Sequence, residues 1–245
     1  MKKLEKFVVE PLPWKGKSAK EPSKRKKPIP WPLPLVGDDQ FLCMNLLGRR
    51  MSGKSTVVAA LIKAYYSHVS RVIILSPTVL NDKTFKQILT WEKVRACDIV
   101  TNEQVEAVFN SQRHYDPSDP ERQEILLVID DSSDDFKRKA LRQQLTRLYT
   151  RSRHSGIHFI VCCHGITFME SPMITNSSQW LIYSLNKTAL KQLAAKISTR
   201  EMDEKAMEIY IDAATEKPYS FAFINFNDPY KNTFYEGFDK IYDPE

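Results

Sequence analysis

Gly48, Gly53, Lys54 and Ser55 have the residue types and spacing of a phosphate-binding loop. They lie in the octapeptide "GRRMSGKS", which fits the pattern G-x-x-x-x-G-K-[ST] at every fixed position. Glycines let the backbone curl so that successive N–H groups point inward, and a helix that follows adds the positive end of its dipole. The octapeptide stands between an apolar run and a helical pattern, so it predicts a binding site for nucleotide phosphates. The alternative is an ordinary glycine-containing turn with a surface lysine.

Each residue of this loop has an expected part in the site. We predict that Lys54 contacts the β- and γ-phosphates, that Ser55 ligates Mg²⁺, and that the amides of about Met51 to Thr56 surround the phosphates. The sequence leaves the roles of the Arg49 and Arg50 side chains open. The complete set of predicted nucleotide contacts is Gly48, Arg49, Arg50, Met51, Ser52, Gly53, Lys54, Ser55 and Thr56.

Two carboxylates follow the most apolar segment of the chain, "ILLVIDD". Ligands of open α/β sheets bind at the carboxyl ends of the strands, which is where Asp130 and Asp131 would stand. We predict that Asp130 holds the Mg²⁺ ion through water and that Asp131 orients and deprotonates the attacking water. The alternative for Asp131 is capping of the helix that follows.

Apolar runs alternate with helical patterns from residue 41 onward, which predicts an α/β fold with a mostly parallel central sheet flanked by helices. The expected strands are 41–47, 71–76, 98–101, 124–130, 157–163, 179–185 and 219–226. The expected helices are 53–68, 102–113, 136–152, 188–197 and 200–215. Residues 114–123 are rich in turn formers and are expected to form a surface loop.

Residues 1–36 differ in composition from the rest of the chain. They carry seven of the fourteen prolines, and residues 1–30 hold ten Lys and Arg against three Glu, a balance of +7 in a chain of net charge +6. Proline removes backbone donors and blocks helices, so we expect an extended, basic, Pro-rich arm over 1–36 and one domain over 37–245. The arm is either a solvated tail, a contact to nucleic acid, or a docking segment anchored by Trp14 and Trp31.

The four cysteines have no metal-ligand spacing, and three of them stand in apolar runs. They are expected to be core residues in a reducing compartment. No apolar run approaches the roughly 18 residues that span a bilayer, so no transmembrane segment is expected.

The order of the phosphate loop, "ILLVIDD" and "RSRHSGIHFIVCCHG" resembles the FtsK–HerA superfamily of DNA-pumping ATPases. Within that superfamily it is similar to the small genome-packaging ATPases of poxvirus-like and virophage-like double-stranded DNA viruses. The resemblance covers about residues 41–185, and the R-x-x-G-I-H stretch narrows it. It implies a RecA-like P-loop core, ATP and Mg²⁺ as ligands, and a homopentameric or homohexameric ring around double-stranded DNA.

Two further site residues follow from the resemblance. Arg153 matches the arginine that completes a neighbouring subunit's site and stabilises charge on the γ-phosphate. The family usually has a glutamine after the next strand, and His164 stands there in this chain, unless the match is shifted to Cys163 or Gly165. His164 can donate one hydrogen bond to phosphate or water, with a charge that depends on pH. The second acidic residue of the family is often Glu, so Asp131 has a shorter reach.

The expected function is ATP-driven translocation of double-stranded DNA, which packages a viral genome in the cytoplasm of an infected cell. Association with the virion, or with a capsid or membrane component through residues 1–36, fits the same reading. The alternatives are another P-loop NTPase, such as a small-molecule kinase or a cellular-type translocase or helicase, and a noncatalytic docking protein. A GTPase fits less well, because "NKTA" (186–189) lacks the aspartate of the guanine-reading N-K-x-D.

Overall fold

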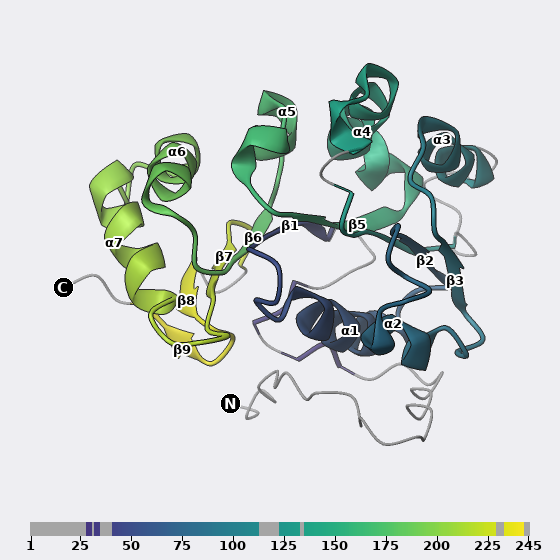
Figure 1. Ribbon diagram of the computed structural model, residues 1–245, viewed down its shortest axis with the longest axis horizontal. Coiled ribbons are helices and arrows are strands. Elements are labelled where there is room, and N and C mark those ends of the chain that lie inside the picture. The colour runs from purple at the N-terminus through teal and green to yellow at the C-terminus, as the bar shows by residue number, and fades with distance from the viewer. Residues whose placement is uncertain are drawn as a thin grey trace.

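The strands form one sheet in the order β3-β2-β4-β5-β1-β6-β7-β8-β9 (Figure 1). This computed structural model describes residues 28–30, 32–34, 41–112, 123–132, 135–228 and 233–242. Six strands pair in parallel: β1 (Cys43–Leu47), β2 (Arg71–Leu75), β3 (Val94–Cys97), β4 (Ile125–Ile129), β5 (Ile157–Cys163) and β6 (Gln179–Ile182). The remaining three are antiparallel: β7 (Ala222–Asn225), β8 (Phe234–Glu236) and β9 (Lys240–Ile241).

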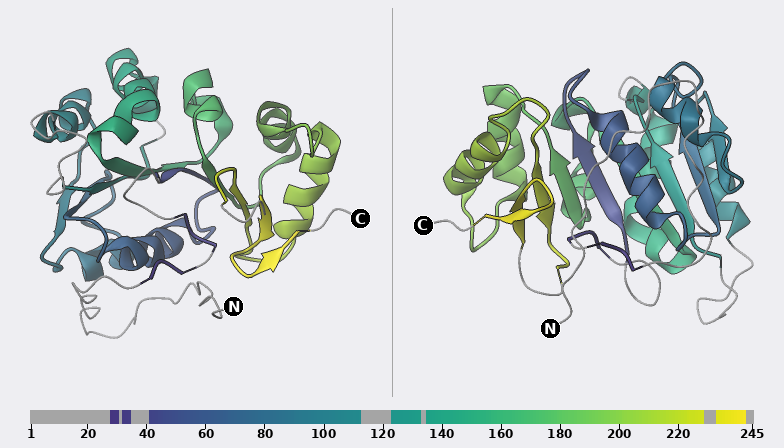
Figure 2. Two further views of the ribbon diagram at one scale, coloured as in Figure 1. Left: turned by 180° about the vertical axis from the view of Figure 1, so that it is seen from behind. Right: turned by 90° about the horizontal axis from the view of Figure 1, so that it is seen from below.

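Helices cover both faces of this sheet (Figures 1 and 2). One face carries α1 (Lys54–Tyr65) and α2 (Lys83–Ile88). The other carries α3 (Asn102–Ser111), α4 (Lys139–Arg151), α5 (Ser171–Thr175), α6 (Lys187–Ile197) and α7 (Glu204–Ala214). Short 3₁₀ turns are η1 (Asp135–Lys137), η2 (Ser152–Ser155) and η3 (Ile166–Phe168). The prediction of an α/β fold with a mostly parallel, helix-flanked sheet is confirmed.

The central strands are apolar on both faces because each face is buried under helices. In β4, Leu127 and Ile129 belong to the core under α3 and α4, whereas Leu126 and Val128 belong to the core under α1 and α2. Successive side chains of a strand point to opposite faces, so one continuous apolar run serves two cores. Cys43, Cys162 and Cys163 lie in these strands as buried free thiols, as expected.

The third strand is Val94–Cys97, and its prediction at 98–101 was wrong. The apolar pair in "DIVT" suggested the strand, but Ile99 is exposed and only Val100 is buried. Strand β3 has β2 as its single partner at the edge of the sheet, so it does not require an apolar run.

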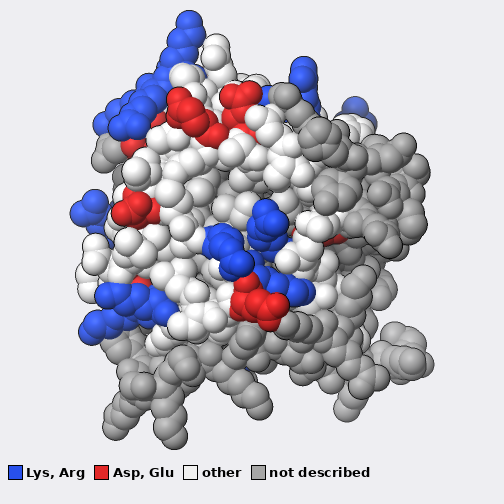
Figure 3. All heavy atoms as spheres, turned by 90° about the vertical axis from the view of Figure 1, so that its right-hand side faces the viewer, with Lys and Arg blue, Asp and Glu red and all other residues white. Residues whose placement is uncertain are grey.

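Figure 3 shows the molecule from this edge, where Lys and Arg side chains gather at the middle beside an acidic group. Arg95 of β3 is one exposed charge here, and charges on an edge strand discourage pairing with another chain.

The aromatic C-terminal segment packs onto the core in the part that the structure describes. Phe234, Tyr235 and Phe238 are all buried, and strand β8 pairs with β7. The helices α2 and α5, of six and five residues, were not expected, because each is too short to show helical periodicity.

Residues 32–34 of the Pro-rich segment lie against the domain. Leu33 is buried, the Tyr65 hydroxyl donates to the Pro34 carbonyl at 2.8 Å, and the Asn225 amide reaches the Pro32 carbonyl at 3.5 Å. This short piece therefore covers the side of α1. Residues 1–27, with the basic cluster and Trp14, lie outside the described residues, as do Trp31 and most of the predicted loop 114–123. The division between an arm over 1–36 and a domain over 37–245 stays a prediction.

A buried amide joins the middle of β1 to two helices. Asn45 is fully buried, its amide nitrogen donates to the Met173 carbonyl of α5 at 3.0 Å, and its Oδ1 accepts the Tyr149 hydroxyl of α4. A buried polar group is costly unless its hydrogen bonds are made, so this connection specifies how α4 and α5 sit on the sheet.

The exchange Tyr149→Phe removes the hydroxyl and leaves Asn45 Oδ1 without its donor. We expect the free energy of unfolding to fall by about 1–3 kcal/mol, the cost of an unsatisfied buried acceptor. Urea denaturation measures the change, and Tyr219→Phe is the matched control because Tyr219 is 73% exposed. Equal stability of the two variants would contradict the role given to this hydrogen bond.

Candidate nucleotide-binding site

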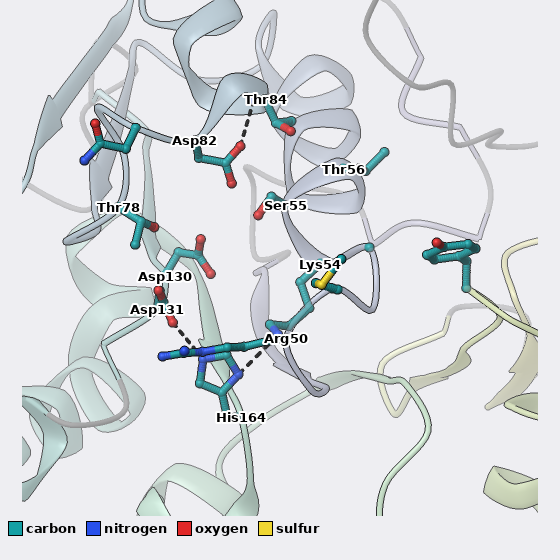
Figure 4. Close-up of a pocket in the computed structure, with 14 residues that line it drawn as sticks. Arg50, Lys54, Ser55, Thr56, Thr78, Asp82, Thr84, Asp130, Asp131 and His164 are labelled. Atoms are coloured by element: carbon teal, nitrogen blue, oxygen red, sulfur yellow. Dashed lines mark hydrogen bonds and ion pairs between the residues drawn. The ribbon is translucent and has the colours of Figure 1, made fainter. Parts of the chain in front are cut away.

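A pocket of about 640 Å³ opens where β1, β2, β4 and β5 end (Figure 4). The carboxyl ends of parallel strands meet at one edge of a sheet, which is the usual ligand position in open α/β folds. The lining residues come from the phosphate loop and α1, from the segments after β2, β4 and β5, and from the segment before β7. They are Arg50, Met51, Gly53, Lys54, Ser55, Thr56, Thr78, Asn81, Asp82, Thr84, Asp130, Asp131, His164 and Tyr219.

The loop between β1 and α1 depends on its two glycines. A Cβ atom at Gly48 would lie 2.8 Å from Ser52 Oγ and 2.9 Å from Tyr183 Cβ, closer than real contacts allow. Gly53 has φ of 98°, a left-handed conformation that glycine adopts without steric cost. The glycine positions of the motif therefore correspond to a close approach and to a reversed backbone turn.

The first turn of α1 faces the pocket with its backbone donors available. Gly53 is the N-cap and provides no side-chain hydrogen bond, and this fully described helix has no acidic residue in its first turn. The Ser52 hydroxyl is buried and has no hydrogen-bond partner among the described residues. Unpaired N–H groups and the positive end of a helix dipole suit an anion, so this part of the pocket fits phosphate.

Lys54 extends from the first turn of α1 back across the loop. Its Nζ atom donates to the carbonyls of Gly48 and Arg49, both at 2.7 Å, and lies 3.3 Å from Nδ1 of His164. Burial lowers the pKa of the Lys54 ammonium from its usual value, because desolvation disfavours the charged form. The carbonyl contacts hold the cation at the floor of the pocket, and Gly48 and Arg49 contribute through their backbone.

Asp130 directly follows β4 and is 3% exposed. Burial raises the pKa of its carboxyl group from the usual 3.8 to about 6, against the opposing effect of a hydrogen bond from the Cys162 thiol. The carboxylate lies in the same pocket as the Ser55 hydroxyl (Figure 4). An alcohol and a carboxylate are hard oxygen ligands of the kind that Mg²⁺ takes, so these two residues fit the predicted metal site. A bound Mg²⁺ ion would supply positive charge to phosphate oxygens there.

The side chains of Asp131 and His164 meet in a hydrogen-bonding contact across the ends of β4 and β5. Their Oδ1 and Nε2 atoms are 2.7 Å apart, and Asp131 has a left-handed φ of 50°. His164 Nδ1 lies 3.3 Å from both Lys54 Nζ and the Gly48 carbonyl oxygen. A neutral imidazole that donates a hydrogen bond from Nε2 to the carboxylate can accept a hydrogen bond from the Lys54 ammonium group at Nδ1. The three side chains thus make a chain from the loop lysine to the carboxylate of β4.

His164 is the residue that the fold brings into the pocket at the position where the resemblance expects glutamine. Cys163, the neighbour considered as an alternative, is a buried residue of β5, and Gly165 is not among the lining residues. His164 therefore presents an imidazole to the pocket, in contact with Asp131, the predicted base.

Arg153 lies near the amino-terminal end of β5, whereas the pocket of its own chain lies at the carboxyl ends of the strands. It is an exposed residue of η2, just before β5, whereas His164 directly follows β5. The seven residues of β5 separate the two positions by roughly 20 Å. Arg153 therefore lies too far from the pocket of its own chain to contact a ligand there.

Five lining residues were missed by sequence reasoning. Thr78, Asn81, Asp82 and Thr84 come from the segment after β2 and the first turn of α2, where the Asp82 side chain accepts the Thr84 amide at 2.7 Å and caps α2. The signal was present, because this polar segment follows a parallel strand, and such segments carry ligand contacts. Tyr219 precedes β7, and it had no motif or spacing to mark it.

The fold and the site together define a P-loop NTPase architecture. Among solved structures, the chain is similar to the genome packaging NTPase B204 from Sulfolobus turreted icosahedral virus 2 in complex with AMP, at a TM-score of 0.59 and 19% identity over 85% of this chain and 100% of that one. It is likewise similar to B204 from Sulfolobus turreted icosahedral virus, described as a DNA-packaging ATPase, at 0.56 and 17% over 75% and 92%.

A third similar structure is the cytoplasmic domain of the type VII secretion ATPase EccC of Thermomonospora curvata. Its TM-score is 0.55 and its identity 16%, over 82% of this chain and 24% of that one. No protein-family model and no curated protein sequence matches the chain. At these identities the comparisons show the fold alone. Among the residues described, no helix has the length and apolar character required to cross a bilayer.

The raised pKa of Asp130 predicts that the free energy of unfolding depends on pH when neither nucleotide nor metal is bound. Between the usual 3.8 and about 6 the folded state binds more protons than the unfolded state, so stability falls as pH rises through this window. Asn carries no charge, so Asp130→Asn avoids this loss, which is at most about 3 kcal/mol above pH 6.

Urea denaturation in EDTA at pH 4 and pH 8 measures the effect. The stability of Asp130→Asn relative to the wild type should increase between these values, since other groups titrate alike in both proteins. A difference that does not change with pH would show that Asp130 is not held in this desolvated state.

Proposed function

We propose that the chain is a Mg²⁺-dependent ATPase that translocates double-stranded DNA, and that its work is to package a viral genome into a capsid. The observation that carries the proposal is the placement of Lys54, Asp130, Asp131 and His164 around one pocket at the uncapped start of α1. The likeness in fold to B204 over all of that chain supports the packaging role. The expected setting is the cytoplasm of an infected cell, with association with the virion.

Each of the pocket residues has a separate proposed role in ATP hydrolysis. Lys54 and the amides at the start of α1 balance the negative charge of the phosphates, and Ser55 and Asp130 hold the metal. Asp131, 28% exposed in its side chain, orients the attacking water and accepts its proton. His164 fixes the direction of the Asp131 carboxylate through the contact at 2.7 Å, and its second nitrogen lies beside Lys54.

The proposed assembly is a homopentameric or homohexameric ring with DNA in its centre. The position of Arg153 supports a ring, because this residue is exposed and lies far from the pocket of its own chain. In a ring that places η2 of one subunit at the pocket of the next, the guanidinium stabilises the charge that develops on the transferred phosphate. Residues 1–36 remain the candidate contact to a capsid or membrane component.

ATP hydrolysis by the purified protein should accelerate when linear double-stranded DNA is added. Lys54→Ala should lower hydrolysis by more than 100-fold with and without DNA, because the lost cation balances the transferred phosphate. Phosphate release measures the rate, and Lys63→Ala, on the last turn of α1, is the matched control. Hydrolysis indifferent to DNA would reject translocation, and hydrolysis unaffected by Lys54→Ala would reject this pocket as its site.

Arg153→Ala should leave ATP binding within about twofold and remove most of the turnover, since the arginine acts on the transition state. Arg151→Ala, two residues earlier and also exposed, serves as the control. Mixing Arg153→Ala with Lys54→Ala protein should restore part of the activity, because the second protein supplies Arg153 to the intact pockets of the first. A mixed ring, verified by mass spectrometry, that shows no restoration would exclude action between subunits.

A further inference from the structure

Three non-glycine residues of the described chain have a left-handed backbone, and all three line the same pocket. They are Met51 with φ of 63°, Asp131 with φ of 50° and Tyr219 with φ of 65°. This conformation is uncommon for residues with a Cβ atom, and a bulky side chain in it is a marked outlier. Such strain concentrates at binding and catalytic sites. Met51 and Asp131 belong to the motifs described above, whereas Tyr219 has no assigned part.

Tyr219 is 73% exposed although its surroundings are well packed. Single exposed aromatic residues are common, so exposure alone indicates nothing. The residues that follow Tyr219 are held in place by two kinds of contact. The Ser220 amide donates to the Lys217 carbonyl at 3.1 Å. The Phe221 ring is buried, with its centroid 5.6 Å from that of Tyr183 and 4.8 Å from that of Phe238. The fold thus holds an aromatic ring outward at the pocket, in a strained backbone, instead of burying it.

The ring lies at the end of the pocket away from the carboxylates. In the sheet, β6 and β7 stand on one side of β1, whereas β5 and β4, which position His164 and the two aspartates, stand on the other. A Cβ atom on Gly53 would lie 3.6 Å from Cδ1 of Tyr219, so the ring adjoins the start of α1. Figure 4 shows Asp130 and Asp131 together on one side of Lys54.

This arrangement gives a bound nucleotide one direction. Its terminal phosphate would lie toward Lys54 and Asp131, and the remaining phosphates would follow the amides at the start of α1. The base is then directed to the end of the pocket that Tyr219 occupies. A flat, exposed and well-supported aromatic ring is the surface on which a nucleobase stacks.

We infer that Tyr219 is the platform for the nucleobase of the bound nucleotide, an inference that rests on the proposed nucleotide-binding function. Every base has a π-face, so stacking adds affinity without choosing between purines. Tyr219 therefore distinguishes a nucleoside triphosphate from a bare polyphosphate. It does not distinguish ATP from GTP.

The variant Tyr219→Asn tests the inference, because Asn adopts a left-handed backbone readily and replaces the ring with a short amide. Tyr219→Phe keeps the ring and is the matched control. Titration calorimetry with Mg²⁺ measures the binding of ATP, GTP and tripolyphosphate. We expect Tyr219→Asn to weaken ATP and GTP alike, by about 5- to 100-fold, and to leave tripolyphosphate unchanged. Tyr219→Phe should bind all three as the wild type does.

The outcomes separate the two proposals. Unchanged ATP affinity in Tyr219→Asn, or an equal loss for ATP and tripolyphosphate, would overturn the role of Tyr219 while the pocket still binds nucleotide. Wild-type protein that binds none of the three ligands would overturn the proposed function, and this inference with it. Tyr219→Ala, measured in parallel with its circular dichroism, shows that the effect follows the loss of the ring and not the new side chain.

Discussion

The buried ammonium group of Lys54 is the interaction on which the site depends. A cation removed from water is costly unless its protons are bound, and here they meet the Gly48 and Arg49 carbonyls and the His164 imidazole. The loop after β1 supplies two partners, and the end of β5 supplies the third. His164 in turn holds Asp131 at the end of β4. The lysine therefore connects three strand ends, and it can do so only because β1, β5 and β4 are adjacent and parallel.

A phosphate that enters the pocket competes with these contacts. Lys54 Nζ lies within hydrogen-bonding distance of the Gly48 and Arg49 carbonyls and of the His164 imidazole, so an anion that binds the lysine takes the place of at least one of these contacts. The imidazole is the weakest held of the three, at 3.3 Å against 2.7 Å for each carbonyl, and is the partner most readily exchanged. The hydrogen bonding of Lys54 and the surroundings of Asp131, the predicted base, are thus connected through the His164 side chain.

Much of the fold and most of the residues that line the pocket could be predicted from the chain, for identifiable reasons. Gly48, Gly53, Lys54 and Ser55 are local in sequence, and the buried run before Asp130 shows a central parallel strand by its composition. Strand β3 was misplaced because an edge strand needs no apolar run. The loop after β2 and the residue Tyr219 were missed for another reason: they reach the pocket only through the lateral order of the strands, which no local pattern records.

The sequence by itself predicted a phosphate-binding loop at "GRRMSGKS", carboxylates after a neighbouring strand and an α/β domain, because glycine spacing and apolar periodicity act over short stretches of chain. Only the tertiary structure decided that His164 joins Lys54 to Asp131, that Arg153 lies away from its own pocket, and that Tyr219 faces the loop from the other side. These relations join segments up to about 170 residues apart. They are set by sheet order and burial, which arise when the whole core packs.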